Sequence, residues 1–206
     1  MEIELIDVSV SYYQKRVLKN INYNFEKGKT YAFTGANGSG KSTLVKVLAG
    51  VLKPAVGDIL YKQNSQEIEV SELPRYLSWV APYINLYEEF DADELYKFHS
   101  KFKKPKLGLE QFLEQTNLKD HRKKRIKYYS SGMKQRLKLS LALFFESEVL
   151  ILDEPTVNLD SKYQQWYLEH LKKLIDDAET LIVIASNIPA EYALAHEVID
   201  VENFKK

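Results

Sequence analysis

Residues 30–43 read Thr-Tyr-Ala-Phe-Thr-Gly-Ala-Asn-Gly-Ser-Gly-Lys-Ser-Thr, a short apolar run that leads into a glycine-rich loop. Within it, residues 35–42 fit the pattern G-x-x-x-x-G-K-[S/T] and carry one glycine more than the pattern requires. Apolar residues at helical spacing come next, and Gly50 marks a plausible helix end. We therefore predict a strand over Thr30–Thr34, a phosphate-binding loop and a helix from Lys41.

The glycines of this loop let the backbone curl so that consecutive N–H groups point at phosphate oxygens. The helix N-terminus adds a partial positive charge. We expect Lys41 to reach the β- and γ-phosphates, the Ser42 hydroxyl to ligate Mg²⁺, and Thr43 to bond another phosphate oxygen. A glycine-rich turn that merely joins strand to helix is disfavoured because both flanks fit the motif. The predicted nucleoside triphosphate site consists of Gly35, Ala36, Asn37, Gly38, Ser39, Gly40, Lys41, Ser42 and Thr43.

A second run, Val149-Leu150-Ile151-Leu152-Asp153-Glu154-Pro155, predicts a buried strand that ends on two carboxylates. Ligands bind at the carboxyl ends of strands in open parallel α/β sheets. Asp153 can hold Mg²⁺ there, usually through water, and Glu154 is placed to polarise a water for in-line attack on the γ-phosphate. A capping carboxylate pair before a proline turn is the alternative interpretation.

The composition excludes several classes of protein. With 206 residues, 45% hydrophobic and 28% charged, the chain is expected to form one globular domain. The absence of cysteine excludes disulfides and thiolate metal sites. Twenty-nine basic and 29 acidic side chains cancel, so net charge gives no case for nucleic acid. No apolar run approaches the roughly 18 residues of a membrane span, and the N-terminus lacks signal-peptide features, so we expect a soluble cytosolic chain.

Strand and helix patterns alternate along the sequence, which predicts an α/β fold with a largely parallel sheet. Between about Pro82 and Tyr128 helix formers dominate, so this part is predicted to be an inserted helical subdomain. Further strands are expected at Ile3–Val10, Ile21–Phe25, Asp58–Tyr61, Leu77–Val80, Val149–Leu152, Leu181–Ala185 and Val198–Val201. Further helices are expected at Asp91–Phe102, Leu109–Thr116, Gly132–Phe145 and Lys162–Leu174.

The two motifs, with Tyr129-Ser130-Ser131-Gly132-Met133-Lys134-Gln135-Arg136 between them, resemble the nucleotide-binding subunit of ATP-binding cassette (ABC) proteins. The family signature reads L-S-G-G-Q followed by x-Q-R and lies just before the D-E-P strand, as here. The resemblance spans essentially the whole chain. It implies a P-loop NTPase core, with an antiparallel N-terminal β subdomain beside the parallel sheet and an inserted α-helical subdomain. Residues 1–206 would form a single ABC ATPase domain, with the catalytic core at about 1–81 and 140–206 and the helical subdomain at about 82–139.

The resemblance also implies a head-to-tail dimer with two ATP molecules and Mg²⁺ between the subunits. Ser130 and Gly132, at a helix N-terminus, would offer donors to the γ-phosphate bound by the partner. Asp160, after Asp-Glu-Pro, resembles part of the family's D-loop. Tyr12 resembles the aromatic residue that stacks on adenine, although Tyr13 is a rival and a partly exposed strand tyrosine is the alternative.

Three positions depart from the family pattern. The signature has Ser131 and Met133 for a glycine and the glutamine, while Gly132 is retained. Pro82 stands where the family's Q-loop glutamine joins the Mg²⁺ shell, a role that proline cannot fill. Asn187 stands at the switch histidine, and it can donate a hydrogen bond but carries no titrating proton. Asn187 is equally well interpreted as a helix N-cap before a proline.

Two surface features remain open at this point. Basic clusters at Lys101–Lys106 and His121–Lys127 invite a nucleic-acid interpretation, but charge runs on helices are usually solvated faces, so no nucleic acid is expected. The aromatic-rich stretch Trp79–Phe90 corresponds to the groove where the family couples to membrane subunits, or else belongs to the core. The four histidines show no metal-ligand spacing.

The function that the resemblance favours is an ATP-hydrolysing subunit that energises a transporter. Its partners would be a second ABC subunit, in a homo- or heterodimer, and separate transmembrane subunits, so the chain would lie in the cytoplasm on the inner face of the cell membrane. Glu154, Lys41 and Asn187 would be catalytic. One alternative is a soluble ABC ATPase acting on DNA or ribosomes, and another is a regulatory module with weak turnover, which Pro82 and Asn187 favour. A small-molecule kinase would leave the signature unexplained.

Overall fold

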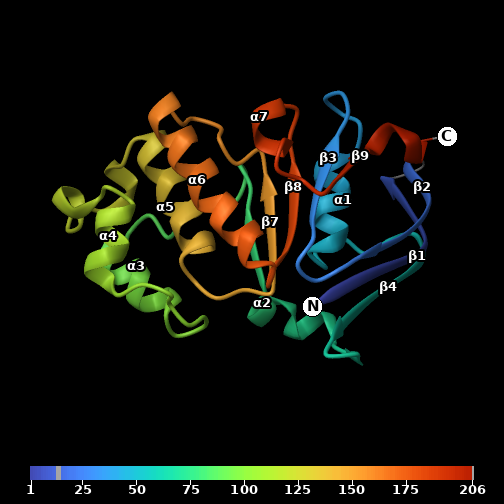
Figure 1. Ribbon diagram of the computed structural model, residues 1–206, viewed down its shortest axis with the longest axis horizontal. Helices are drawn as coiled ribbons and strands as arrows, with labels where there is room; N and C mark the ends of the chain where they lie inside the picture. Colours follow the sequence, from blue (N-terminus) through green and yellow to red (C-terminus); the bar gives the residue numbers. More distant parts are fainter. Residues whose placement is uncertain (13–14, 206) are drawn as a thin grey trace.

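The computed structural model describes residues 1–12 and 15–205, which form two sheets and the helices that pack on them (Figure 1). The first sheet is antiparallel, with strand order β2-β1-β4-β5. The second is parallel, with order β6-β7-β8-β3-β9. The strands are β1 (Glu2–Tyr12), β2 (Lys15–Phe25), β3 (Thr30–Thr34), β4 (Val56–Gln63), β5 (Gln66–Glu67), β6 (Leu77–Val80), β7 (Val149–Asp153), β8 (Leu181–Ala185) and β9 (Glu197–Asp200).

The helices lie on the sheets and at the end of the molecule away from the antiparallel sheet (Figure 1). Short 3-10 turns connect several of them, and the last one, Val201–Lys205, ends the described chain. No helix of the described residues has both the length and the apolar character needed to cross a bilayer. The α-helices are α1 (Lys41–Leu48), α2 (Leu73–Tyr76), α3 (Ala92–His99), α4 (Leu109–Gln115), α5 (Ser131–Leu143), α6 (Ser161–Asp177) and α7 (Pro189–Tyr192).

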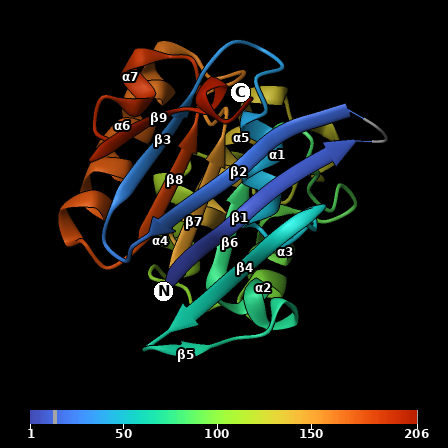
Figure 2. The same cartoon turned by 90° about the vertical axis from the view of Figure 1, so that its right-hand side faces the viewer.

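Helix α1 lies between the two sheets, which Figure 2 shows from the side of the antiparallel sheet. Its residues Leu44, Val45, Val47 and Leu48 are buried together with apolar side chains of β1, β2 and β3 in one continuous core. Burial of this face, rather than the propensity of an eight-residue helix, stabilises α1 because isolated helices this short are marginal in water. The core therefore fixes where the start of α1 lies relative to the sheet edge.

The central strands of the parallel sheet are apolar on both faces. Every residue of β7 and β8 is buried, and so are the first four residues of β3. Strands covered on both faces read as continuous apolar runs, which is why Val149–Leu152 and Leu181–Ala185 show no alternation. All three strands end at the same edge of the sheet, and the loops that follow them carry the residues of the site.

A second apolar core joins α3, α4 and α5 to the other face of the parallel sheet. Phe112 and Phe145, both fully buried, are at its centre. Asp91 starts α3 with a reciprocal capping box, in which its side chain accepts from the Glu94 N–H and the Glu94 side chain accepts from the Asp91 N–H. These contacts hold α3 and α4 in the same apolar core as α5, which carries the signature segment.

The fold class predicted from the sequence is confirmed, while some boundaries were wrong. The helix predicted to run to Phe102 ends at His99, because the Ser100 hydroxyl bonds back to Tyr96 O and the chain turns there. The last strand is Glu197–Asp200 rather than Val198–Val201, since Val201 is buried at the start of a 3-10 turn. Strand β5 and helix α2, of two and four residues, were missed.

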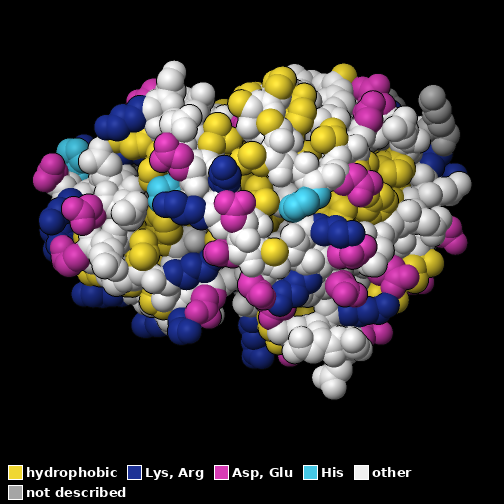
Figure 3. Space-filling model, viewed as in Figure 1, with side chains coloured by type: hydrophobic (Ala, Val, Ile, Leu, Met, Phe, Trp, Pro, Cys, Tyr) yellow, Lys and Arg dark blue, Asp and Glu magenta, His cyan; other side chains and the backbone are white. Residues whose placement is uncertain are grey.

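Several members of the basic cluster His121–Lys127 are paired with carboxylates. Arg122 contacts Asp93 and Glu110, and Arg125 and Lys127 both contact Glu89. Over the face that Figure 3 displays, basic and acidic side chains are interspersed. This is the pattern of a solvated, ion-paired surface.

Candidate active site

The glycine-rich loop joins β3 to α1 through left-handed backbone conformations that glycine adopts without strain. Gly35, Gly38 and Gly40 have φ values of 128°, 77° and 112°. A Cβ at Gly40 would lie 2.9 Å from Leu18 Cδ2, whereas a Cβ at Gly38 would meet nothing within 4 Å. The loop is thus tightly packed on its inner side and leaves open space beside Gly38. Because α1 begins directly after Gly40, its first N–H groups face this loop.

Two buried polar groups of the loop are suited to a phosphate ligand. The Lys41 side chain is 7% exposed, and its Nζ donates to Gly35 O at 2.7 Å and Ala36 O at 3.3 Å. The Ser39 hydroxyl is fully buried and has no hydrogen-bond partner among the described residues. An ammonium held only by carbonyl oxygens keeps its positive charge available for an anion. The loop therefore fits a phosphate group at the N-terminus of α1.

Asp153 connects the end of β7 to the phosphate loop. It is 1% exposed, and its Oδ1 accepts a hydrogen bond from Ser42 Oγ at 3.2 Å. Its Oδ2 accepts from Tyr83 Oη at 3.0 Å. Burial raises the pKa of the Asp153 carboxyl, and the hydrogen bonds from Ser42 and Tyr83 act in the opposite direction. The two motifs that are 111 residues apart in the sequence thus meet through one hydrogen bond.

The donor set at this point fits Mg²⁺. A serine hydroxyl and a carboxylate are hard oxygen ligands, which Mg²⁺ prefers, and Mg²⁺ in nucleotide sites takes its other ligands from phosphates and water. Among the described residues, no group of three or more His, Cys, Asp or Glu side chains could hold a metal by itself.

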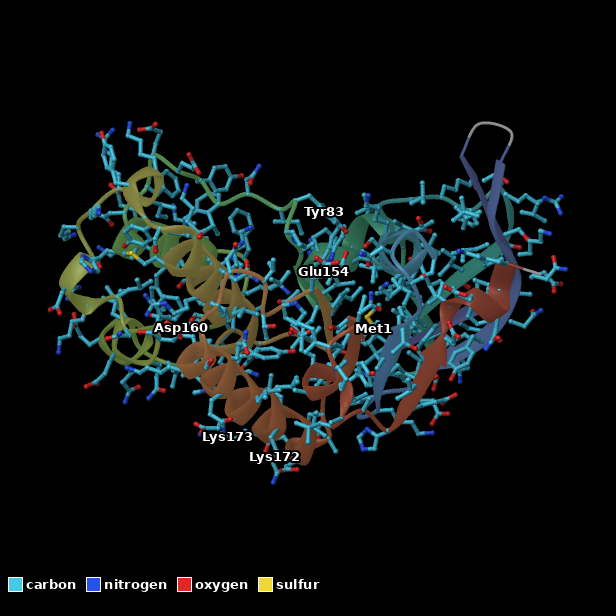
Figure 4. The ribbon with its side chains drawn as sticks, turned by 90° about the horizontal axis from the view of Figure 1, so that it is seen from above. Met1, Tyr83, Glu154, Asp160, Lys172 and Lys173 are labelled. Atoms are coloured by element: carbon cyan, nitrogen blue, oxygen red, sulfur yellow. The ribbon has the colours of Figure 1, made fainter. Side chains whose placement is uncertain are left out.

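Glu154 follows Asp153 in a left-handed backbone conformation, with φ of 48°. Its N–H donates to Ala185 O at 2.9 Å, which continues the pairing of β7 with β8 for one residue. This conformation is uncommon for a residue other than glycine, and it leaves the carboxylate exposed while the preceding Asp153 is buried. Figure 4 shows Glu154 and Tyr83 at the same edge of the parallel sheet. Glu154 is thus accessible beside the phosphate loop.

Asn187 follows β8 and reaches the phosphate loop. Its Nδ2 donates to Asn37 Oδ1 at 3.1 Å, and the side chain is exposed. The N-cap of α7 is Ile188, whose N–H is bonded by the Ser186 hydroxyl. The interpretation of Asn187 as a helix N-cap is therefore wrong, and its amide lies among the loop residues instead.

The signature residues and Asp160 lie at the starts of α5 and α6, apart from the phosphate loop. Ser130 is the N-cap of α5, where its hydroxyl accepts from the Met133 N–H at 3.2 Å. A Cβ on Gly132 would come within 3.1 Å of Asn158 O, so the start of α5 packs closely on the segment before α6. Asp160 is the N-cap of α6 and accepts from the Tyr163 N–H at 3.0 Å. Figure 4 shows Asp160 well away from Glu154 and Tyr83.

The predicted site residues fall into two groups. The loop residues, Asp153, Glu154 and Asn187 come together at one edge of the parallel sheet. Ser130, Gly132 and Asp160 form a separate group at the helical end. Tyr12 ends β1, and its side chain, like the whole of Tyr13, lies outside the described residues, so the proposed stacking on adenine stays a prediction.

The sequence analysis did not predict two contacts of the site. Tyr83, one residue after the unexpected Pro82, donates to Asp153. Glu202 Oε1 accepts from the Ala36 N–H at 3.0 Å and so connects the end of the chain to the phosphate loop. In the sequence Tyr83 stood out as one of the aromatic residues of the stretch Trp79–Phe90, and nothing there predicted its contact with Asp153.

Comparisons with known proteins identify the family of this chain. The family model described as "ABC transporter" matches residues 18–157. The putative ABC transporter ATP-binding protein PH0132 of Pyrococcus horikoshii is 33% identical over 96% of this chain and 78% of its own length. The uncharacterized ABC transporter ATP-binding protein YhcH of Bacillus subtilis is 27% identical over 98% of this chain and 70% of its own length.

A solved structure shows the same fold. It is described as a dimeric structure of a post-hydrolysis state of the ATP-binding cassette MJ0796 bound to ADP and Pi. Its TM-score is 0.81 at 22% identity, over 97% of this chain and 95% of that chain. Both sheets of the present chain therefore have their counterparts in a solved cassette.

Proposed function

The chain belongs to the ABC transporter family of ATP-binding proteins, and from that premise we propose how its residues bind and hydrolyse ATP. Family membership makes it an ATP-binding subunit with ATPase activity. The observation that carries the assignment of residues is the Ser42–Asp153 hydrogen bond of 3.2 Å. It joins the phosphate loop to the strand end that bears Glu154.

We assign the triphosphate to the loop between β3 and α1. The N–H groups of residues 36–43 and the start of α1 bind phosphate oxygens, and Lys41 exchanges its two carbonyl partners for the β- and γ-phosphates. Ser42 and Asp153 would hold Mg²⁺, which would supply positive charge to neutralise the phosphate oxygens. The pairing of a buried, unpartnered Ser39 hydroxyl with open space beside Gly38 supports this placement.

We assign the role of general base to Glu154. Its left-handed backbone leaves the carboxylate exposed at the strand end next to the metal-binding Asp153, where it can accept a proton from an attacking water. Asn187, hydrogen-bonded to Asn37 of the loop, donates to the γ-phosphate. It cannot carry the positive charge of a protonated histidine, so we expect slower turnover than a histidine would give.

We propose that Ser130, Gly132 and Asp160 act on the nucleotide of a second subunit. All three lie at the N-terminal tips of α5 and α6, where N–H groups and the helix dipole favour an anion, and they lie apart from the chain's own phosphate loop. The similar cassette MJ0796 is described as dimeric. ATP would then hold two subunits together, and hydrolysis would weaken the contact.

The membrane role follows from the family. We propose that the dimer docks on separate transmembrane subunits at the cytoplasmic face of the membrane, with a catalytic core at about 1–81 and 140–206 and a helical subdomain at about 82–139. An apolar groove between these parts, of about 830 Å³, is lined by Trp79, Tyr87 and Phe98 among others, which supports the earlier interpretation of Trp79–Phe90 as a coupling surface.

The test of this proposal is Glu154→Gln, which keeps the shape of the side chain and removes the base. We expect ATP binding to persist, phosphate release to fall at least about 100-fold, and an ATP-bound dimer to accumulate in size-exclusion chromatography. Glu169→Gln, at an exposed position of α6, is the matched control and should behave as wild type. Wild-type turnover in Glu154→Gln would remove Glu154 from the mechanism, and failure of the wild-type chain to bind ATP would refute the site itself.

A further inference from the structure

The Tyr83 side chain, on the loop after β6, bonds the same Asp153 carboxylate as Ser42 of α1. Its Oη donates to Oδ2 at 3.0 Å, while Ser42 Oγ donates to Oδ1 at 3.2 Å. Each carboxylate oxygen therefore has its own donor. Rotation of the carboxylate about its last bond would break both hydrogen bonds, so the pair fixes its orientation.

The ring of Tyr83 is also held in place. It meets the Trp79 ring edge to face, with centroids 5.7 Å apart and an interplanar angle of 76°. The ring also contacts Lys46, whose Nζ lies 4.7 Å from the ring centroid. Lys46 is one helical turn after Ser42 on α1, so the same helix contributes the metal ligand and a contact to Tyr83.

The sheet explains why Tyr83 reaches this point. Strand β6 lies beside β7 in parallel, with Val80 paired to Leu152. The loop after Val80 therefore leaves the sheet next to Asp153, at the edge where ligands of parallel α/β sheets bind. Pro82 has no side-chain donor, and the next residue along the loop supplies one.

We propose that Tyr83 is a positioning residue for the metal-bound nucleotide: its hydroxyl holds the Asp153 carboxylate in the orientation that binds Mg²⁺ or the water of its shell. This inference rests on the proposed Mg²⁺–ATP site. A tyrosine hydroxyl on the loop after β6 thereby supports the metal site, to which the proline at position 82 offers no side-chain donor. Tyr83 acts through Asp153 and does not touch the reacting atoms.

The test compares nucleotide binding with and without metal in Tyr83→Phe, which removes only the hydroxyl and keeps the ring beside Trp79 and Lys46. Binding of a non-hydrolysable ATP analogue is measured by titration calorimetry across a Mg²⁺ series and in EDTA. We expect the Mg²⁺ concentration for half-maximal binding to rise about tenfold, the size of one lost hydrogen bond to a charged group. Binding in EDTA should stay within about twofold of wild type, because the phosphate loop is unchanged.

Tyr87→Phe is the matched control. Tyr87 lies on the same loop with its ring against Phe90 and Phe98, and its side chain is exposed. Its variant should keep the wild-type Mg²⁺ dependence. A second readout is the emission of Trp79 in a Trp166→Phe background, since Trp79 contacts Tyr83 directly. Addition of Mg²⁺ to the nucleotide complex should change this emission, and the change should shrink in Tyr83→Phe.

The outcomes separate the inference from the function on which it rests. If wild type shows Mg²⁺-dependent binding and Tyr83→Phe matches it, the role of Tyr83 is refuted while the site stands. A lower Mg²⁺ concentration for half-maximal binding in Tyr83→Phe than in wild type would also refute this role, because the hydroxyl would then compete with the metal for Asp153. If wild-type binding does not respond to Mg²⁺ at all, the proposed metal site fails.

Discussion

His99, at the end of α3, is expected to limit the stability of the protein in acid. Its ring packs edge to face on Phe145, with centroids 4.6 Å apart, and Nε2 is buried with no hydrogen-bond partner among the described residues. Burial, assisted by the positive charge of nearby Lys103, lowers the pKa of His99 from 6.5 to about 4. The His99 imidazole therefore binds a proton more weakly in the folded state than in the unfolded state. Substitution of His99 by phenylalanine should remove this penalty and keep the ring contact.

The size of the effect follows from the two pKa values. Between pH 6.5 and about 4 the unfolded state binds more protons than the folded state, so the free energy of unfolding falls as the pH falls. Linkage over the interval from pH 7 to pH 5 gives a loss of about 2 kcal/mol from this one group. The loss reaches its full size below about pH 4, where the folded state binds the proton as well.

The assay is urea unfolding of wild type and His99→Phe at pH 7 and pH 5, followed by circular dichroism. The free energy of unfolding of the variant should exceed that of wild type by about 2 kcal/mol more at pH 5 than at pH 7. The same substitution at His121, whose side chain is exposed, controls for the loss of a histidine. Parallel stability curves for wild type and His99→Phe over this range would show that the pKa of His99 is not depressed, and the reasoning from burial would be wrong.

Two further substitutions separate packing from chemistry. Phe112→Ala should cost about 3–5 kcal/mol of unfolding free energy, since the ring is fully buried against Tyr96 and Phe145, and a denaturation midpoint close to wild type would contradict the described core. Asn187→Ala, at an exposed position, should change unfolding free energy by less than about 0.5 kcal/mol but slow phosphate release, because it removes the donor bonded to Asn37. Unchanged phosphate release would exclude Asn187 from the site.

The regular part of the fold could be predicted because its signals are local. The glycine-rich loop and the run Val149–Asp153 each combine a buried strand with residues of fixed chemistry, and the structure places both at one sheet edge. The ends of elements were less predictable since tertiary contacts decide them. His99 ends α3 although the sequence pattern extended the helix to Phe102, since the Ser100 hydroxyl bonds back to Tyr96 O and the exposed Phe102 adds no buried contact.

Contacts between distant loops could not be read from spacing. Asn187 was open to two interpretations because asparagine caps helices as readily as it donates to phosphates. Only the arrangement of β8 beside β3 decides between them, since it brings the residue after β8 to the loop after β3. A sequence pattern gives the residue type, whereas the order of strands in the sheet gives its neighbours.

The order of strands also explains why a missing glutamine need not leave the metal site incomplete. Because β6 lies beside β7 in the parallel sheet, with Val80 paired to Leu152, the chain leaves β6 next to Asp153. A tyrosine one position after Pro82 reaches the Asp153 carboxylate, as the 3.0 Å contact of Tyr83 shows. The position at which a loop leaves the carboxyl end of its strand decides which carboxylate the loop can contact, and more than one residue of the loop can make that contact. For that reason a departure at a single position, such as Pro82, predicts little until the neighbouring residues are placed in space.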